Sequence, residues 1–500
     1  MRRVVGVIAS LMTVVCVLIP SGLVQAADGK AKVYVVLWFD TEDYLLPASD
    51  DAALRLATFL KSQGVKATFK VVGEKARTLE KRGRTDVINA LRDHEIGYHS
   101  NFHSTQPSPA LYLNQLGWTD GVIEFDRREK AGFEDVRRIF GQVPSCYGQP
   151  GTSWAPQAFG AMRGWGMPIY LDAGQHVKLD DKPYYYGGIF TMYKLAHQLR
   201  TMLAKPADVD VAEQQFQMSR EALLKEGGSL VSIIYHPCEF VHKEFWDGVN
   251  FREGANPPRS AWKLPREKTA EEKAVAFGNF ERYITFMKHF PEVQFITARE
   301  ALHLYRDESA GKSFSRDDLK TIAQNCRPDV SFVKLGNAYL SAAEAFTLLN
   351  SFVARSNEVD GIEFMRLEAP PFGPGRASTE FKTEQKIPTN QVMRTAVDVQ
   401  GYVARHGMIP NAVWLGSVNV PPEVYLQGLA TLTLSLLEGK EVPAEITFKP
   451  ATLAAAKYVS DDDVKLWKWA IFPKGFHAPS LMQTAKLQAW TLKPAVLHPQ

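Results

Sequence analysis

A chain of 500 residues with 45% hydrophobic and 23% charged side chains has an ordinary globular composition, and its length favours two or three domains over one. The formal net charge is only +3, and Arg2 and Arg3 supply two of those charges, so the rest of the chain is close to neutral. No basic run or stripe stands out, which excludes nucleic acid as the expected partner.

The first 26 residues have the pattern of a secretory signal peptide. The two arginines precede an almost entirely apolar run at 4–19, and Pro20, Gly22 and a small-residue pattern that ends at Ala26 follow. An uncleaved membrane anchor is the alternative, but the run is too short for a comfortable span. We therefore expect cleavage after Ala26, a secreted or periplasmic protein, and no membrane contact by the mature chain.

From residue 30 to residue 308 the sequence alternates strand patterns with helix patterns. Repeated units of this kind imply a parallel sheet, open or closed into a barrel. In such folds the chemistry lies at the carboxyl ends of the strands. The predicted strands are residues 33–39, 65–72, 95–98, 143–147, 167–171, 229–235 and 293–297, and the predicted helices include 52–62, 80–92, 121–140, 211–225 and 268–289.

The C-terminal part, residues 311–500, is predicted to be a mainly α-helical domain of unknown role. Helical patterns cover 341–355, 391–406 and 423–438. A faint internal echo is present, because the pattern of Val, Leu and Gly at 333–336 returns at 413–416, about 80 residues later. The echo marks either two related helical modules or a chance similarity.

Three cysteines remain after the leader is removed, and they form no Cys-x-x-Cys metal motif. Export would permit one disulfide, for which Cys146 and Cys238 are the candidates because both lie beside motifs described below. Two small buried thiols are an equally good interpretation.

The strongest chemical pattern is a histidine pair, His99 and His103, directly after the predicted strand at 95–98. If the backbone is helical there, residues four apart share a face and both imidazoles reach one metal ion. The spacing alone is weak, because unrelated histidines also produce it. Its place at a strand end, with Ser100 able to fix the loop by a local hydrogen bond, favours a metal site.

Acidic side chains follow the first predicted strand. Asp40, Glu42 and Asp43 come directly after residues 33–39. Carboxylates at the end of a buried strand are costly unless a cation compensates them. The alternative is a solvated loop before a helix, where acids are common. Together with the histidine pair, the acidic segment strengthens the prediction of a metal site.

A third predicted strand end carries His236. The strand at 229–235 is followed by His236 and Pro237, and the proline stops the strand. Asp172 follows the strand at 167–171 and is expected to orient the imidazole and raise its pKa. A lone histidine at a strand end is more often structural, so this feature only supports the site.

In this order, the segments resemble the polysaccharide deacetylases of the NodB-homology type, carbohydrate esterase family four. The resemblance covers roughly residues 32–304. Residues 39–42 resemble the acidic motif of the family, residues 95–103 its histidine motif, and Ile234 with His236 its last motif. The resemblance implies a distorted (β/α) barrel that removes acetyl groups from N- or O-acetylated polysaccharides or oligosaccharides.

The resemblance also implies a role for each residue. A divalent metal, with Zn²⁺ as the first candidate, is held by Glu42, His99 and His103, and a position stays open for water. Asp43 remains an alternative ligand. Asp40 acts as general base, and it shares a face with Glu42 because residues two apart in an extended segment do so.

The remaining catalytic and substrate-binding residues follow from the same motifs. His236 is expected to protonate the leaving group while Asp172 holds its imidazole. A backbone N–H near Tyr147 is expected to stabilise the oxyanion. The expected substrate-binding residues are Tyr147, Pro150, Trp154 and Ile234.

Two departures from the family pattern bear on activity. The family's acidic motif has two adjacent aspartates, and here Thr41 occupies the second place. The family's third motif begins with an arginine that pairs with the catalytic aspartate, and here Gly148 replaces it. Either another cation substitutes for the arginine or the activity is impaired.

The second of these outcomes leads to a rival function, a catalytically impaired glycan-binding protein of the cell surface. A further rival is another metal-dependent hydrolase, of amides or glycosides, on a similar barrel. The family's usual tryptophan after the fourth motif is also absent next to Asp172, and Trp154, Trp165 or Tyr184 is expected to line the pocket instead.

Overall fold

The computed structural model describes residues 31–498 except 327–328, 356–360 and 440. The predicted signal peptide at 1–26 lies outside the described residues. Within them, no helix has the length and apolar character that a membrane crossing requires.

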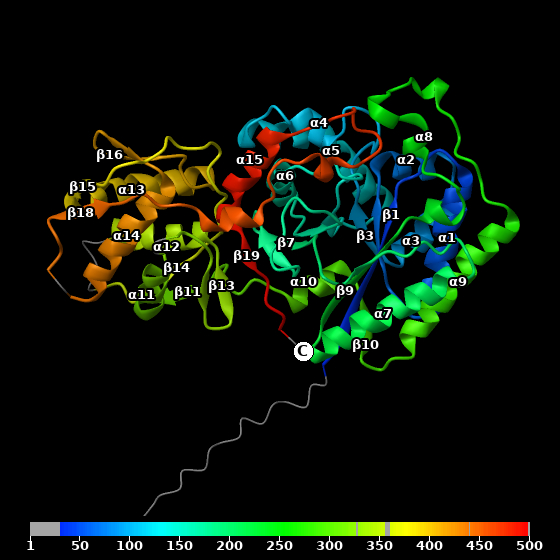
Figure 1. Ribbon diagram of the computed structural model, residues 1–500, viewed down its shortest axis with the longest axis horizontal. Coiled ribbons are helices and arrows are strands. Elements are labelled where there is room, and N and C mark those ends of the chain that lie inside the picture. The colour runs from blue at the N-terminus through cyan, green and yellow to red at the C-terminus, as the bar shows by residue number, and fades with distance from the viewer. Residues whose placement is uncertain (1–30, 327–328, 356–360, 440, 499–500) are drawn as a thin grey trace, which may run out of the picture.

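A curled, open sheet of mostly parallel strands forms the centre of the molecule (Figure 1). The strand order is β19-β6-β7-β5-β4-β3-β2-β1-β9-β8, and β10 also pairs with β1. The predicted α/β fold with a parallel sheet is confirmed. The strands are β1 (Val33–Thr41), β2 (Thr68–Val71), β3 (Glu95–Tyr98), β4 (Cys146–Tyr147), β5 (Ile169–Leu171), β6 (Tyr184–Tyr186), β7 (Ile189–Met192), β8 (Gln198–Leu199), β9 (Ser229–Tyr235), β10 (Val293–Ile296) and β19 (Lys493–Pro494).

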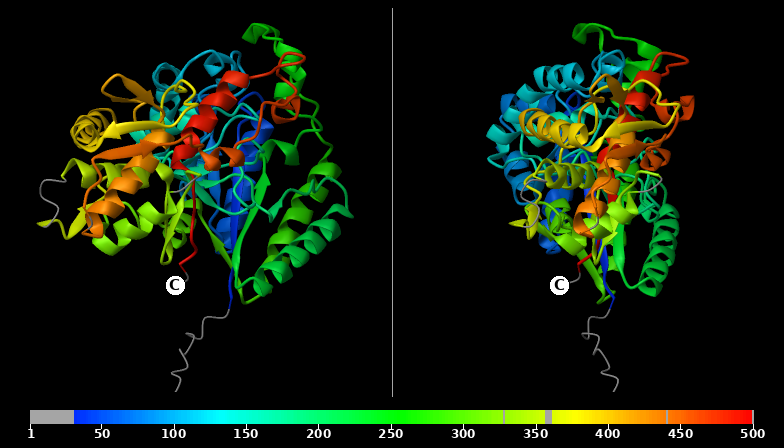
Figure 2. Two further views of the ribbon diagram at one scale, coloured as in Figure 1. Left: turned by 60° about the vertical axis from the view of Figure 1, so that its left-hand side comes forward. Right: turned by 90° about the vertical axis from the view of Figure 1, so that its left-hand side faces the viewer.

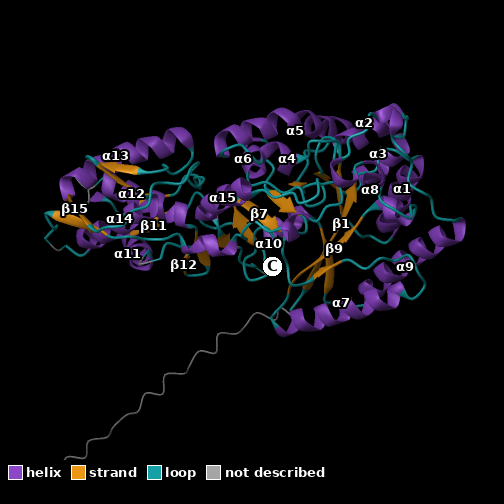
Figure 3. Ribbon diagram, turned by 45° about the horizontal axis from the view of Figure 1, so that its top comes forward, coloured by secondary structure: helices purple, strands orange, loops and turns teal. Residues whose placement is uncertain are grey.

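Helices pack around this sheet (Figure 3). All nine residues of β1 are buried, as expected of a central parallel strand that is covered on both faces. The helix predicted at 80–92 is two helices, because Gly83 adopts a positive φ of 66° and breaks it. The helices are α1 (Pro47–Ser62), α2 (Gly73–Lys81), α3 (Thr85–Arg92), α4 (Pro109–Leu113), α5 (Trp118–Phe140), α6 (Gln157–Gly164), α7 (Asp208–Lys225), α8 (Trp246–Asn250), α9 (Ala270–Lys288) and α10 (Ala298–Leu304).

The following region contains two copies of one unit, each ordered strand, helix, hairpin, helix, strand. In both copies the outer strands pair with each other and the hairpin turns at a glycine of positive φ, Gly336 or Gly416. The sequence echo therefore marks a structural repeat. The copies are β11 (Ser313–Ser315), α11 (Arg316–Asn325), β12 (Val333–Leu335), β13 (Ala338–Leu340), α12 (Ala342–Ala354), β14 (Phe364–Arg366), and β15 (Gln385–Pro388), α13 (Thr389–His406), β16 (Val413–Leu415), β17 (Val418–Val420), α14 (Pro422–Leu437), β18 (Glu445–Phe448).

The last part of the chain returns to the sheet. Helix α15 (Pro479–Gln488), shown in red in Figures 1 and 2, packs its apolar residues into the core around the sheet, and β19 pairs with β6. The core of the repeated units is separate and gathers around α12 and α14. The boundary predicted near residue 310 stays a prediction, but residues far beyond it help to build the sheet core.

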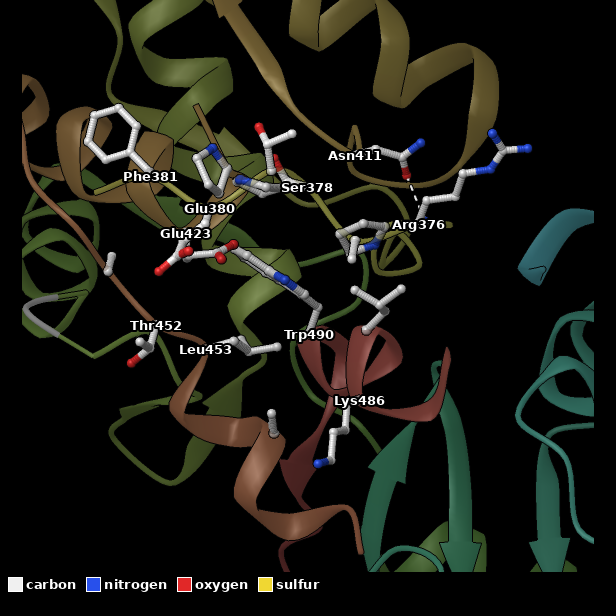
Figure 4. A pocket seen from close by; sticks show the side chains of 18 of the residues that line it. Arg376, Ser378, Glu380, Phe381, Asn411, Glu423, Thr452, Leu453, Lys486 and Trp490 are labelled. Atoms are coloured by element: carbon white, nitrogen blue, oxygen red, sulfur yellow. Dashed lines mark hydrogen bonds between the residues drawn. The ribbon is translucent and has the colours of Figure 1, made fainter. Parts of the chain in front are cut away.

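A cavity of about 510 Å³ lies where the second unit meets the C-terminal helix (Figure 4). Its wall includes Trp490, Glu423 and the loop at 374–381. None of the predicted catalytic residues lines it.

Cys146 and Cys238 are both buried, and neither takes part in a disulfide. The disulfide considered for Cys146 and Cys238 is therefore not formed.

Candidate active site

The predicted metal and catalytic residues meet in one cleft at the carboxyl ends of the parallel strands. The cleft has a volume of about 720 Å³. Because β1, β2, β3, β5 and β9 run in the same direction, the residues that follow them reach the same edge of the sheet. The cleft is lined by Asp40, Glu42, His99, His103, Asp172 and His236, among others.

Glu42, His99 and His103 form a group with the spacing of metal ligands, and one side-chain atom from each lies within 4.8 Å of the others. Oε2 of Glu42 is 2.8 Å from Nε2 of His103 and 3.8 Å from Nε2 of His99. Both Nε2 atoms are buried and converge on the carboxylate of Glu42. Two buried imidazole nitrogens that face one buried carboxylate fit a divalent cation such as Zn²⁺.

The histidine segment is a tight turn and not a helix as the spacing suggested. Ser100 and His103 adopt positive φ values of 68° and 59°. Oγ of Ser100 accepts a hydrogen bond from the backbone N–H of His103 and holds this turn. Nδ1 of His99 donates to the carbonyl of Gly148 at 3.0 Å, which leaves Nε2 as the atom with the free lone pair. Unfavourable backbone conformations of this kind persist where the surroundings hold them, often at functional sites.

Asp43, the alternative ligand, lies outside this group. Its Oδ2 is 3.2 Å from Nδ1 of His242, and its Oδ1 accepts a hydrogen bond from the backbone of Leu45. Burial raises the pKa of Asp43 to about 6, although Lys75 opposes the shift. The geometry therefore favours Glu42 over Asp43 as the acidic ligand.

A buried cation, Lys70, lies among the acidic residues. The register between β1 and β2 places it beside Asp40. Its Nζ is 2.9 Å from Oδ1 of Asp40 and 2.8 Å from Oδ2 of Asp172, and it lies over the ring of Trp38 at 4.1 Å from the centroid. The side chain of Lys70 is fully buried. A buried ammonium requires such partners, so Lys70 and the two carboxylates hold one another in place.

Gly148 leaves the space that Lys70 occupies. A Cβ atom at residue 148 would lie 1.9 Å from Nζ of Lys70 and 2.3 Å from Oδ2 of Asp172. The arginine that the family resemblance led us to expect is thus absent, and Lys70 brings a cation to Asp40 from another strand. The same ammonium compensates a second group with the spacing of metal ligands, formed by Asp40, His99 and Asp172.

The charges around Asp40 decide its protonation state. Burial disfavours the ionised carboxylate, but His99, Lys70 and His236 outweigh burial and lower the pKa of Asp40. Burial and the like charge of Asp40 raise the pKa of Asp172, against the effect of Lys70. Asp40 is therefore the carboxylate that stays ionised, as a general base must.

His236 lies close to Asp40, with Nε2 3.6 Å from Oδ2. The prediction that Asp172 orients His236 is wrong for the described residues, because no hydrogen bond or ion pair joins them and Asp172 is held by Lys70. Two charged groups lie at Nδ1 of His236: Oε2 of Glu239 at 3.4 Å and a guanidinium nitrogen of Arg200, also at 3.4 Å. Arg200 and Glu239 pair with each other as well. Burial and the charge of Arg200 lower the pKa of His236, but Glu239 and Glu42 outweigh them and raise the pKa above the usual value.

Of the predicted substrate-binding residues, Ile234 lines the cleft. Tyr147 and Trp154 do not, because both side chains are buried: Tyr147 packs on Tyr98, and Trp154 stacks on His176. Pro150 is also buried and is not among the residues that line the cleft, nor are Trp165 and Tyr184. The backbone N–H of Gly148, next to Tyr147, donates to the carbonyl of Tyr98 and is not free for an oxyanion.

Several residues of the cleft were not predicted. Lys70 had a signal, because it is a charged residue between the apolar Phe69 and Val71 of a predicted strand. Glu239 follows His236 by three residues, a spacing that a 3-10 turn at Pro237–Phe240 brings together. Trp469 had no signal, since it lies far along the chain from every motif.

No protein-family model matches the chain, and no curated protein matches it either. Solved structures that do match include a protein described as a polysaccharide deacetylase from Mycobacterium smegmatis, 14% identical, with 56% of this chain and 92% of that chain covered and a TM-score of 0.37. Puue allantoinase is 13% identical, with coverages of 55% and 91% and a TM-score of 0.36. A pseudoenzyme of the CE4 family from Bacillus anthracis is 14% identical, with coverages of 55% and 66% and a TM-score of 0.29. Likeness this distant carries no argument about activity, so the function has to be argued from the site.

Proposed function

We propose that this protein is a metal-dependent hydrolase that removes acetyl groups from N- or O-acetylated carbohydrate. One observation carries the proposal: Asp40, kept ionised beside Lys70, adjoins a buried group of Glu42, His99 and His103 that fits a divalent metal. The carbohydrate substrate follows from the motif resemblance. We also propose, from the leader pattern alone, that the protein acts outside the cytoplasm.

Each residue has a distinct task in this reaction. A divalent cation, Zn²⁺ as the first candidate, supplies Lewis-acid polarisation of the acetyl carbonyl and makes water a stronger acid. Asp40 accepts the proton of the attacking water, and Lys70 with Asp172 fixes the orientation of its carboxylate. His236 protonates the departing amine or hydroxyl, and Glu239 favours its protonated form.

The rival function, a catalytically impaired glycan-binding protein, rested on the absence of the motif arginine at Gly148. Lys70 weakens that case, because it supplies a cation to the same aspartate. We therefore favour an active enzyme.

Chelation is expected to abolish acetate release by the purified protein. The reason is that Glu42, His99 and His103 fit a metal ion, and their proposed role requires one. The measurement is acetate release from chitooligosaccharide, peptidoglycan and acetylated xylan, before and after chelation and after Zn²⁺ is added back. Full activity in a protein shown by elemental analysis to be free of metal would refute the metal role.

The pH dependence of kcat/KM is expected to reflect the pKa of His236, which Glu239 raises. A general acid acts only while it is protonated, and the raised pKa of His236 extends activity above the usual histidine value of about 6.5. Glu239→Gln removes the charge that raises this pKa, so the basic limb of the kcat/KM profile should move to lower pH. Glu281→Gln, outside the cleft and paired with Arg55, should leave the limb in place. An unmoved limb in Glu239→Gln would show that His236 is not the acid.

A further inference from the structure

Trp469 comes from the C-terminal part of the chain and forms a wall of the catalytic cleft. It follows a 3-10 turn at Val464–Trp467 and precedes α15. Its ring meets that of His103 edge-on, with 5.2 Å between the centroids and an angle of 80°. Trp469 is half-buried and lines the cleft, so part of its ring faces the space beside the proposed metal ligands.

Hydrogen bonds from two sides of the cleft hold this tryptophan. Its Nε1 donates to Oδ2 of Asp247 at 2.6 Å, and its backbone N–H donates to Oγ1 of Thr152 at 3.2 Å. The next two residues are also fixed, because the carbonyls of Ala470 and Ile471 accept hydrogen bonds from the loop after α8. An aromatic ring held in this way loses little conformational entropy when a ligand binds against it.

Gly151 allows the ring to lie directly against the loop on the other side of the cleft. A Cβ atom at this position would be 2.2 Å from the ring of Trp469, and the φ of Gly151 is +52°. Any side chain here would displace the tryptophan. The cleft thus has its present shape because a glycine of one segment accommodates the indole of another.

The chemistry of the wall suits a sugar ring. Apart from the histidines, Trp469 and Phe245 are the aromatic residues that line the cleft, since Trp38, Trp154 and Trp246 are buried. Polar and charged residues line the same cleft, including Asp247, which binds the indole N–H, and the arginines Arg200 and Arg252. A sugar combines an apolar C–H face with hydroxyl groups at its edge, and a partly exposed indole among charged side chains offers both kinds of contact.

We propose that the C-terminal segment completes the active site and that Trp469 is the platform on which a sugar ring of the substrate stacks. This inference rests on the proposed function and extends it, because it makes Trp469 a specificity-determining residue. It assigns the C-terminal part of the chain a direct role in substrate binding. A small acetyl compound without an adjoining sugar ring should not need the platform.

The test compares Trp469→Ala, Trp469→Phe and the control Trp414→Ala in the full, zinc-loaded chain. Trp414 is 61% exposed on β16 and is not among the residues that line the cleft. We expect Trp469→Ala to raise KM for acetylated chitooligosaccharide about tenfold, as loss of a stacking contact does, with little change in kcat. Trp469→Phe should keep most of the affinity for the oligosaccharide. Both Trp469 variants should hydrolyse 4-nitrophenyl acetate as the wild type does, because this small substrate has no sugar ring to stack on the indole. Elemental analysis must show unchanged zinc, because Trp469 touches His103.

A second variant perturbs the platform from the opposite side. Gly151→Ala should displace the indole and raise KM in the same way, while Trp469 itself remains. Equal KM values for wild type, Trp469→Ala and Gly151→Ala would overturn the inference.

Binding is measured separately from turnover, by calorimetry with chitooligosaccharide and acetylated xylooligosaccharide in an Asp40→Asn background. If the wild type releases no acetate but binding depends on Trp469, the proposed function fails and the platform stands. If neither oligosaccharide binds, or binding is the same without Trp469, the platform is refuted whatever the outcome for acetate release.

Discussion

Asp40→Asn is expected to lose acetate release by a factor of about 10² to 10⁴ while it keeps its bound metal, which is the range that general-base catalysis contributes. Asparagine has nearly the same shape and can still accept a hydrogen bond from Lys70, so the fold should survive. Glu42→Gln is expected to lose both activity and metal, because Oε2 of Glu42 lies against Nε2 of His103. The two carboxylates are two residues apart on one strand end, yet their substitutions should separate the roles of base and ligand.

Asp43→Asn is the matched control for this pair. Its side chain faces His242 and lies outside the metal group, so metal content and activity should stay near those of the wild type. Metal content is measured by elemental analysis and activity by acetate release, and His99→Ala should behave like Glu42→Gln. Loss of metal in Asp43→Asn, or in Asp40→Asn, would contradict the assignment.

Side chains alternate between the two faces of an extended strand, and this alternation explains which residues at the ends of β1 and β4 were predicted correctly to reach the cleft and which were not. Asp40 and Glu42 were placed on one face, and the structure brings both to the cleft while Asp43 turns the other way. The same rule applies to β4, where Tyr147 packs into the core and the next residue, Gly148, faces Lys70 and Asp172. The motif predicts Tyr147 at the substrate, but the alternation along β4 turns its side chain into the core.

Aromatic residues were predicted less well than charged ones, for a physical reason. A carboxylate or an imidazole at a buried strand end needs a partner, so its position implies a site. An aromatic ring is stable in the core without one, and Trp154 is buried there against His176. Trp469 could not be found from local pattern at all, because its position depends on how the end of the chain folds back onto the sheet.

The fold itself was largely predictable, since buried parallel strands have continuous apolar patterns. The repeated unit was visible only as a weak echo, because its strands are three or four residues long and only one residue pattern is shared. The positive φ of Gly336 and Gly416 explains why the shared pattern includes a glycine at this position.

Lys70→Met is expected to lose activity by a factor comparable to that of Asp40→Asn, although Lys70 contacts no metal ligand directly in the proposed mechanism. Asp40 and Asp172 would face each other without their shared cation, and removal of one partner of a buried ion pair costs about 3–5 kcal/mol of folding free energy. Lys70→Arg keeps the charge and two hydrogen-bond donors, so it should retain a stable fold and most of the activity.

The pH profile of kcat/KM distinguishes whether Lys70 positions and ionises Asp40 or only supports the fold. Lys70 lowers the pKa of Asp40, so its removal should raise that pKa and move the acidic limb of kcat/KM to higher pH. Lys70→Arg should leave the limb near its wild-type position. A reduced kcat with an unmoved limb in Lys70→Met would mean that Lys70 supports the fold and not the base.

The sharpest test of the role of Lys70 moves its positive charge from β2 to residue 148, which follows β4. Gly148→Arg in the wild type should be poorly tolerated, because its Cβ would overlap Nζ of Lys70. A Lys70→Ala background removes the ammonium, and the arginine can then reach Asp40 and Asp172. Oδ2 of Asp172 and the carbonyl of Leu171, which lie 2.3 Å and 2.6 Å from the same Cβ, must still shift. We therefore expect the double variant to be more active than either single variant, a non-additivity that only groups sharing one space and one partner produce. A double variant no better than its parents would mean that Gly148 and Lys70 do not exchange roles around Asp40.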